Sequence, residues 1–378
     1  MKRNIFALLL IALGVLPAAA QISYDAFHPG EPWLDDKGTH INAHGGGVLY
    51  EQGTYYWFGE HKTAGKQGNR AWVGVHCYSS RDLYNWKDEG IALNVMPEGS
   101  GSDIEAGCIL ERPKVLYNAK TRKYVMWFHL EPKGQGYAGA RIGIAQADKV
   151  TGPYTFVRST RATPRMWPVN VKPEHKRPVD EAHRAERNNL DPGEDPDEVN
   201  TLGRDFEEGQ QSRDMTLFLD DDGRAYHICA SESNSTLHIN QLTDDFLDFS
   251  GKYVRAFVGR KMEAPAFFKR DGLYYFMGSD CTGWRPNPAR SAVAPSIWGP
   301  WTELGNPCVD DEAETTYRSQ STFFLPVAGT DQVIYMGDRW QPDNAIDGRY
   351  IWLPVEWTED GSRFILRWKA EWRLEGGE

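Results

Sequence analysis

Several polar residues of this chain stand directly before strand-like segments, and their types suit acid–base chemistry and ligand binding. They are His44, Glu111, Arg112, Arg213, Asp214, Glu263, Ser319 and Gln320. Carboxyl groups can exchange protons with a substrate, whereas arginine and amide side chains hold polar ligands. If the fold gathers the starts of these segments, the residues form one polar site.

Glu263 is the candidate proton donor of this set. It lies between Met262 and Ala264, and desolvation by apolar neighbours raises the pKa of a carboxyl group toward that of a useful general acid. The alternative is a structural glutamate paired with Arg112 or Arg213. Glu111 directly precedes Arg112, so we expect Glu111 to remain ionised.

A hairpin pattern that recurs five times must position these residues. In each copy a short apolar run, a polar turn and an aromatic-rich run follow one another, as a β-hairpin requires. The copies are GGGVLYEQGTYYWFGE from Gly45, PKVLYNAKTRKYVMWFH from Pro113, DMTLFLDDDGRAYHICAS from Asp214, APAFFKRDGLYYFMGSD from Ala264 and STFFLPVAGTDQVIYMGDRW from Ser321.

Weaker strand segments follow the hairpins and complete four strands per unit. They begin at Trp72, Arg141, Thr236, Arg290 and Tyr350. Five four-stranded units without amphipathic helices between them predict an all-β fold, a five-bladed β-propeller whose innermost strands surround a central channel. A β-sandwich is the competing architecture, although sandwiches rarely repeat one hairpin five times.

The amino-acid composition of the chain limits the classes of molecule that it could bind. The net charge is −11, which argues against nucleic acid as a partner. The 14 Trp, 17 Tyr and 16 Phe suit either packing in a β-rich core or platforms for sugars. Five cysteines without CxxC spacing indicate no zinc site, and a Cys281–Cys308 disulfide is a candidate.

The N-terminus has the pattern of an export signal. Lys2 and Arg3 precede an apolar run from Ile5 to Leu16, and Ala18-Ala19-Ala20 follows. The run is shorter than the roughly 20 residues of a membrane span. We therefore expect residues 1–20 to be a signal peptide and residues 21–378 to form a single domain, exported to the periplasm, the cell surface or the medium.

A charged, proline-rich insertion interrupts the repeat at about residues 160–211. It is expected to be a surface loop with at most one helical turn. Its carboxylates Asp191, Glu194, Asp195 and Asp197 could hold a structural calcium ion, although the spacing is not that of an EF-hand.

Taken together, the motifs resemble glycoside hydrolase family 43, and more narrowly its subfamily 24, the exo-β-1,3-galactanase-like enzymes. The resemblance covers most of the mature chain. It is carried by AHGGG at Ala43–Gly47, WFGEHK at Trp57–Lys62, LERPKVLYN at Leu110–Asn118, SRDMTLFLDDDG at Ser212–Gly223, EAPAFFKRDGLYYFMGSDCTGW at Glu263–Trp284 and RSQSTF at Arg318–Phe323.

The resemblance implies an inverting enzyme with Glu263 as general acid and no required cofactor. Glu111 matches the carboxylate that binds substrate and tunes its surroundings, and Gln320 the residue that holds or activates water. Sugar-contacting positions match Glu60, Arg112, Asp214 and Trp284.

The catalytic base is the anomaly of this set. Glycoside hydrolysis normally uses two carboxylates, yet His44 stands in the first unit where the family usually has an Asp. An amide such as Gln320 must orient the water, form an imidic acid or relay a proton. His44 is assigned a supporting role toward substrate or a channel ion. Trp284 either stacks on a sugar or packs within its blade.

The function expected from the resemblance is an exo-acting β-1,3-galactosidase on galactan or arabinogalactan, with a polysaccharide or oligosaccharide as its partner. Two alternatives remain. One is an α-L-arabinofuranosidase or β-xylosidase, and the other is a carbohydrate-binding propeller without catalysis, as the missing base suggests. The insertion departs from the expected subfamily pattern and bears on specificity.

Overall fold

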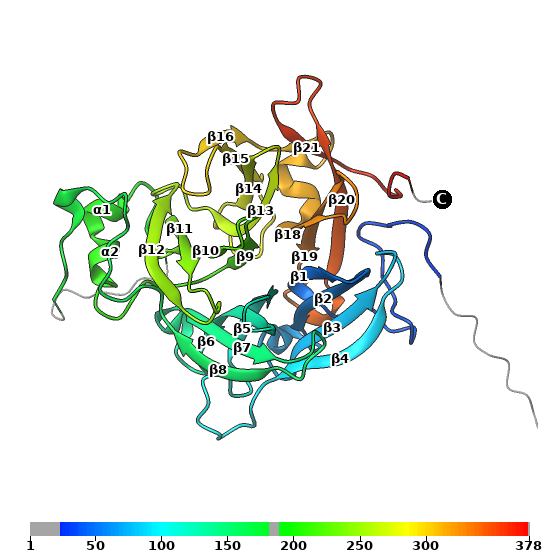
Figure 1. Cartoon of the computed structure of the whole chain (residues 1–378), viewed down its shortest axis with the longest axis horizontal. Coiled ribbons are helices and arrows are strands. Elements are labelled where there is room, and N and C mark those ends of the chain that lie inside the picture. The colour runs from blue at the N-terminus through cyan, green and yellow to red at the C-terminus, as the bar shows by residue number, and fades with distance from the viewer. Residues whose placement is uncertain (1–22, 181–188, 377–378) are drawn as a thin grey trace, which may run out of the picture.

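Five antiparallel sheets surround a central axis in the computed structural model, which describes residues 23–180 and 189–376 (Figure 1). The fold is the expected five-bladed β-propeller. The predicted signal peptide lies outside the described residues.

The strands follow one another outward in each blade, from the innermost strand to the rim. They are, blade by blade, β1 (His44–Glu51), β2 (Thr54–His61), β3 (Gly74–Ser80) and β4 (Lys87–Asn94); β5 (Ile109–Asn118), β6 (Lys123–Glu131), β7 (Arg141–Ala147) and β8 (Thr155–Thr160); β9 (Met215–Leu219), β10 (Ala225–Ser231), β11 (Thr236–Leu242) and β12 (Phe249–Ala256); β13 (Glu263–Arg270), β14 (Leu273–Ser279), β15 (Arg290–Ala294) and β16 (Thr302–Gly305); and β18 (Gln320–Pro326), β19 (Val333–Arg339), β20 (Arg349–Trp357) and β21 (Phe364–Arg367).

Two of the inner hairpins turn on polar residue pairs. Gln52 and Gly53 join β1 to β2 with φ of 48° and 82°, and Asp271 and Gly272 join β13 to β14 with φ of 50° and 76°. Two successive positive φ angles match the twist of the flanking strands and favour Asp-Gly pairs. The turn residues therefore set the register of these hairpins.

The fifth blade has one strand more than expected. The short strand β17 (Cys308–Val309) runs parallel to β21 at its outer edge and makes this sheet five-stranded. Cys308 is thus buried in the fifth blade, and Cys308 and Cys281 are both free thiols, so the candidate disulfide between them is wrong for this structure.

Aromatic packing closes the ring between the first and fifth blades. Trp57 and Trp352 lie with ring centroids 4.8 Å apart, and Phe27 stacks on Trp372 at 4.3 Å. Backbone hydrogen bonds between Phe27 and Trp372 join the segment before β1 to the segment after β21. Burial of such large rings is strongly stabilising, so many of the tryptophans are structural.

Helical structure is confined to short segments in the described residues. They are α1 (Pro196–Val199), α2 (Thr201–Arg204) and the 3-10 helices at Lys66–Asn69, Gly136–Gly139, Pro173–His175, Ala313–Arg318 and Ala345–Asp347. None of these helices has the length and apolar character needed to cross a membrane.

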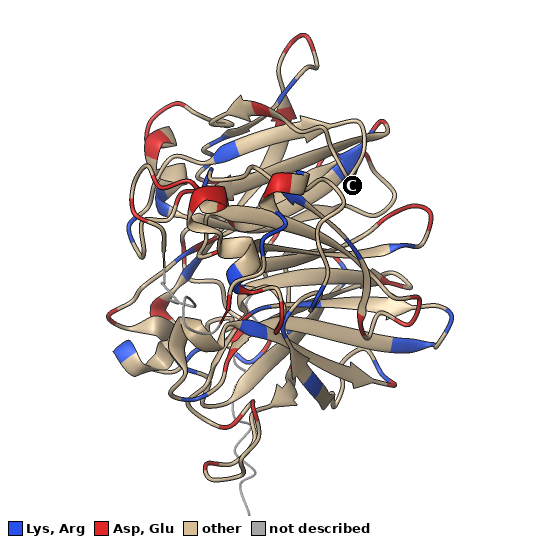
Figure 2. Cartoon of the chain, turned by 90° about the vertical axis from the view of Figure 1, so that its left-hand side faces the viewer, with Lys and Arg blue, Asp and Glu red and all other residues tan. Residues whose placement is uncertain are grey.

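The charges of both signs are interspersed over the face that carries α1 and α2 (Figure 2).

Candidate active site

A polar cavity of about 160 Å³ lies at the end of the channel where the innermost strands begin. Its lining comes from all five blades and consists of Glu60, Lys62, Glu111, Arg112, Tyr137, Asp214, Glu263, Gly283, Trp284, Gln320 and Trp340. Five of the strand-start candidates, Glu111, Arg112, Asp214, Glu263 and Gln320, therefore meet in one place, together with Glu60 and Trp284, which the family resemblance indicated.

Bulges at the start of the inner strands aim these side chains into the cavity. The strand register shifts between Glu111 and Lys114 in β5 and between Glu263 and Ala266 in β13. Arg112 and Ala264 accordingly have φ of 57° and 52°. A bulge adds a residue to one strand and turns its side chains away from the regular alternation, which allows neighbouring residues to serve the same pocket.

Position 45, at the corresponding bulge of β1, requires a glycine for two reasons. Its φ is 60°, and the Glu60 side chain packs closely against its Cα. A Cβ atom there would lie 2.1 Å from Glu60 Oε1. Because glycine has no side chain, the Glu60 carboxylate can lie here and accept a hydrogen bond from the backbone N–H of Arg112 at 2.9 Å.

Glu263 is partly buried at the wall of the cavity. Loss of hydration and the neighbouring Asp214 charge raise the pKa of Glu263 to about 8, against the lowering effect of Arg112 and Arg213. Its two carboxyl oxygens accept hydrogen bonds from side-chain amides, Oε1 from Asn234 and Oε2 from Gln320, each at 3.2 Å. A carboxyl group in this state is protonated at neutral pH, as a general acid must be.

The Gln320 amide uses all its hydrogen-bonding positions. Its oxygen accepts from Arg112 NH2 at 2.7 Å and from Trp340 Nε1 at 2.9 Å. Its Nε2 donates to Glu263 and, at 3.0 Å, to Ser279 Oγ. Two donors facing the oxygen favour the ordinary amide over a tautomer that carries a proton there.

Comparison with known proteins agrees with this geometry. Residues 195–362 match the model of glycosyl hydrolases family 43. A solved β-1,3-galactosidase of that family, with galactodeoxynojirimycin, is 48% identical, with a TM-score of 0.86 over 92% of this chain and 100% of that one. This chain belongs to glycoside hydrolase family 43.

Two further similar proteins share less of their sequence with this chain. A variant of the exo-β-1,3-galactanase from Phanerochaete chrysosporium, with β-1,3-galactotriose, is 30% identical with a TM-score of 0.73, over 93% of this chain and 69% of that one. A β-D-galactofuranosidase from Aspergillus niger is 28% identical over 144 residues, and the match spans 37% of this chain and 41% of that protein.

Glu111 lies in surroundings that Arg112 does not dominate, although Arg112 follows it in the chain. Burial and the charge of Glu60 raise the pKa of Glu111 to about 7. The Arg112 side chain turns toward Asp214 and Gln320 instead. The cations that favour the ionised form of Glu111 are Lys62 and His129.

His44 does not line this cavity, and neither do Arg213 and Ser319, the other two strand-start candidates outside it. The His44 ring is fully buried, and its Nδ1 lies 3.2 Å from Asp338 Oδ1. Asp338 Oδ2 in turn accepts from the backbone N–H of Gly45 at 3.1 Å. His44 therefore supports the bulge behind the pocket of this family 43 protein.

Four lining residues were not predicted from the sequence: Lys62, Tyr137, Gly283, which directly precedes the predicted Trp284, and Trp340. Lys62 and Trp340 stand in motifs that had been recognised, WFGEHK and GDRW, but each lies beyond the strand start that selected candidates. Tyr137 belongs to a loop between β6 and β7 and carries no local signal; its ring lies 4.1 Å from the Arg213 guanidinium.

The acidic residues of the insertion have protein partners. Asp195 caps α1 by accepting from the backbone N–H of Asp197, and Asp197 pairs with Arg255 at 2.6 Å. The described part of the chain holds no group of three or more His, Cys, Asp or Glu side chains placed to bind a metal ion.

Proposed function

We propose that this family 43 glycoside hydrolase is an exported, exo-acting, inverting β-1,3-galactosidase that releases galactose from β-1,3-galactan. The observation that carries the proposal is the pairing of Glu263 with Gln320 in a cavity lined by Trp284 and Trp340. Relatives that share 48% and 30% of their residues with this chain are a β-1,3-galactosidase and an exo-β-1,3-galactanase.

The cavity size supports cleavage from a chain end. A cavity of about 160 Å³ that is lined by all five blades suits one sugar ring at the end of a chain. Exposed Trp284 lies edge-on to Trp340, with ring centroids 6.0 Å apart. Aromatic faces and edges at the mouth give a sugar an apolar contact while the charged groups below bind its hydroxyls.

In the proposed reaction Glu263 gives its proton to the glycosidic oxygen as the bond from the anomeric carbon to that oxygen breaks. A water molecule adds to the anomeric carbon from the opposite face, and its proton passes to a carboxylate of the same cavity. Glu60, Glu111 and Asp214 are the acceptors that the cavity offers.

Gln320 acts as an orienting residue in this scheme. Arrival of the sugar replaces the hydrogen bond from Gln320 Nε2 to Glu263 and frees that N–H. The freed N–H then donates to the water oxygen, because the carbonyl oxygen of Gln320 is occupied by Arg112 and Trp340. The Gln320 hydrogen bond favours the ionised form of Glu263, so its loss raises the pKa of Glu263 and keeps the carboxyl group protonated until the proton is transferred.

Product analysis tests the proposal. The purified chain is incubated with β-1,3-galactan, arabinan, xylan oligosaccharides and a β-galactofuranoside, and products are followed by mass and by anomeric NMR. We expect galactose alone at early times, with inverted configuration. Release of arabinose, xylose or galactofuranose instead would assign a different specificity, and binding of galactan without any product would show a non-catalytic carbohydrate-binding propeller.

A further inference from the structure

The insertion is folded against the third blade where the structure describes it. Residues Ala162 and Gln210 pair across its base, and the rings of Trp167 and Phe206 stack with centroids 4.3 Å apart. The helices α1 and α2 lie on the outer side of β12 in Figure 1. The described part of the insertion thus contacts the blade that carries the β10–β11 turn, and its Asn189 Oδ1 lies 3.4 Å from Asn234 Nδ2 of that turn.

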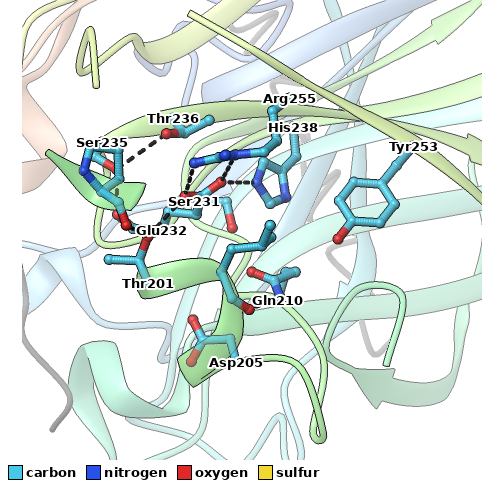
Figure 3. Close-up of polar contacts among 12 residues, drawn as sticks. Thr201, Asp205, Gln210, Ser231, Glu232, Ser235, Thr236, His238, Tyr253 and Arg255 are labelled. Atoms are coloured by element: carbon cyan, nitrogen blue, oxygen red, sulfur yellow. Dashed lines mark hydrogen bonds and ion pairs between the residues drawn. The ribbon is translucent and has the colours of Figure 1, made fainter. Parts of the chain in front are cut away.

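A buried charge cluster joins the insertion to that turn (Figure 3). We call it the Glu232 cluster; its members are Glu232, His238, Arg255, Thr201 and Asp197. The fully buried Glu232 carboxylate accepts from Arg255 Nε and NH2, both at 2.8 Å, from His238 Nε2 at 2.7 Å and from Thr201 Oγ1 at 2.9 Å. These contacts lower the pKa of Glu232 to about 2, with Arg255 the largest favourable contribution.

Two members of the cluster come from the insertion. Thr201 begins α2 and is fully buried, and Asp197 of α1 accepts from Arg255 NH1 at 2.6 Å. The insertion thus supplies the fourth donor to Glu232 and the second carboxylate to Arg255. Buried charges of this kind are stable only when every partner is in place.

The turn that Glu232 begins has an unusual backbone. Glu232, Ser233 and Asn234 have φ of 50°, 57° and 60°, three successive left-handed residues, none of them glycine. Such conformations are disfavoured for side chains with a Cβ and persist only where the surroundings hold them. Here the anchored Glu232 carboxylate and the contact of Cys281 Sγ with the Asn234 carbonyl at 3.7 Å hold the turn.

The turn delivers Asn234 to the candidate proton donor. Asn234 is 4% exposed, and its Nδ2 donates to Glu263 Oε1 at 3.2 Å. Asn234 is therefore the partner of the oxygen that Gln320 does not contact. Together the two amides fix both carboxyl oxygens of Glu263 and so the direction in which its proton points.

We infer that Asn234 is a positioning residue for Glu263, and that the insertion, through Thr201 and the Glu232 cluster, holds Asn234 in place. The inference rests on the proposed function of Glu263 as proton donor. It assigns the insertion a role in orienting the acid, distinct from any contact with the substrate.

The test uses Asn234→Ala, Thr201→Val and the control Thr216→Val in the full chain. Thr216 is a buried threonine of β9 in the same blade, and its hydroxyl faces only the carbonyl of Leu217, at 3.5 Å. Both valine variants keep the side-chain shape and remove one hydroxyl. The readouts are kcat and KM on β-1,3-galactan across a pH series, with thermal unfolding as the check on folding.

We expect Asn234→Ala to lower kcat at least tenfold with little change in KM, and to move the alkaline limb of the kcat/KM profile to higher pH. The charged groups that face Glu263 remain in this variant; they are Asp214, Arg112 and Arg213. The shift of the alkaline limb therefore reports the loss of the Asn234 amide donor to the Glu263 carboxylate. Thr201→Val should shift kcat and the alkaline limb in the same directions by a smaller amount, whereas Thr216→Val should match the parent.

Two results would overturn the inference. One is an Asn234→Ala profile that coincides with the parent. The other is a rise in KM alone, which would make Asn234 a sugar contact. The proposed function of Glu263 fails by a different result, full activity in Glu263→Gln.

Discussion

Arg112 and Asp214 form a two-point ion pair in the wall of the cavity, with Nε to Oδ1 at 3.1 Å and NH2 to Oδ2 at 2.8 Å. They come from the second and third blades and are 102 positions apart in the chain. The same guanidinium contacts Gln320 from the fifth blade. One buried side chain therefore connects three blades and orders the acidic residues around it.

Arg112→Lys should weaken catalysis while keeping the positive charge. A lysine ammonium cannot reproduce the planar fork that contacts Asp214 and Gln320 together. We expect kcat/KM on β-1,3-galactan to fall by roughly 10-fold to 100-fold. The matched control is Arg260→Lys, whose guanidinium makes the same fork to Glu303, at 2.9 Å and 2.8 Å, on the protein surface. Equal activity in the two variants would contradict the role of Arg112.

Glu263→Gln should abolish most of the turnover. The substitution keeps the shape and removes the transferable proton, and general acid catalysis contributes on the order of 10²–10⁴-fold. We expect kcat to fall by that amount while galactan binding, measured by calorimetry, persists. Glu303→Gln serves as the control because Glu303 is a surface partner of Arg260. Parent-like kcat in Glu263→Gln would show that another group donates the proton.

The raised pKa of Glu263 also predicts how stability depends on pH. Its folded pKa of about 8 lies above the ordinary glutamate pKa of 4.5, so between these values the folded protein keeps a proton that the unfolded chain releases. Stability contributed by this group therefore falls as pH rises through that window. The melting temperature of Glu263→Gln relative to the parent should rise from about pH 5 to about pH 8 and then level off.

Glu303→Gln should show the opposite trend in the same melting experiment. Arg260 lowers the pKa of Glu303, so this carboxylate stabilises the folded state at higher pH and the variant loses that contribution. A parallel pH trend in the two variants would mean that Glu263 is not protonated in the folded protein.

Trp284→Ala should weaken substrate binding without affecting the fold. Its side chain is 48% exposed at the cavity mouth, and the loss of one aromatic contact corresponds to about 0.5–1.5 kcal/mol. We expect KM to rise roughly 2-fold to 12-fold, with kcat and the melting temperature nearly unchanged. Trp72→Ala, at a position 40% exposed and outside the cavity, is the control. An unchanged KM would assign Trp284 to packing.

The strand-start rule found most of the site because it follows from the architecture. In a ring of blades the innermost strands begin at one end of the channel, so Glu111, Asp214, Glu263 and Gln320 meet although no local pattern connects them. The rule placed His44 in the same set, yet His44 lies behind the bulge. It could not find Tyr137, which a loop carries in from the second blade.

The amino-acid sequence by itself determined the repeating hairpins, because apolar runs and turn pairs such as Asp271-Gly272 act between near neighbours in the chain. It also indicated Glu263 from its apolar setting. Only the tertiary structure decided which cation faces which carboxylate: Arg112 turns to Asp214, and Arg255 to Glu232 and Asp197. Such pairings connect distant segments, and they are settled by how the blades and the insertion pack once the ring has closed.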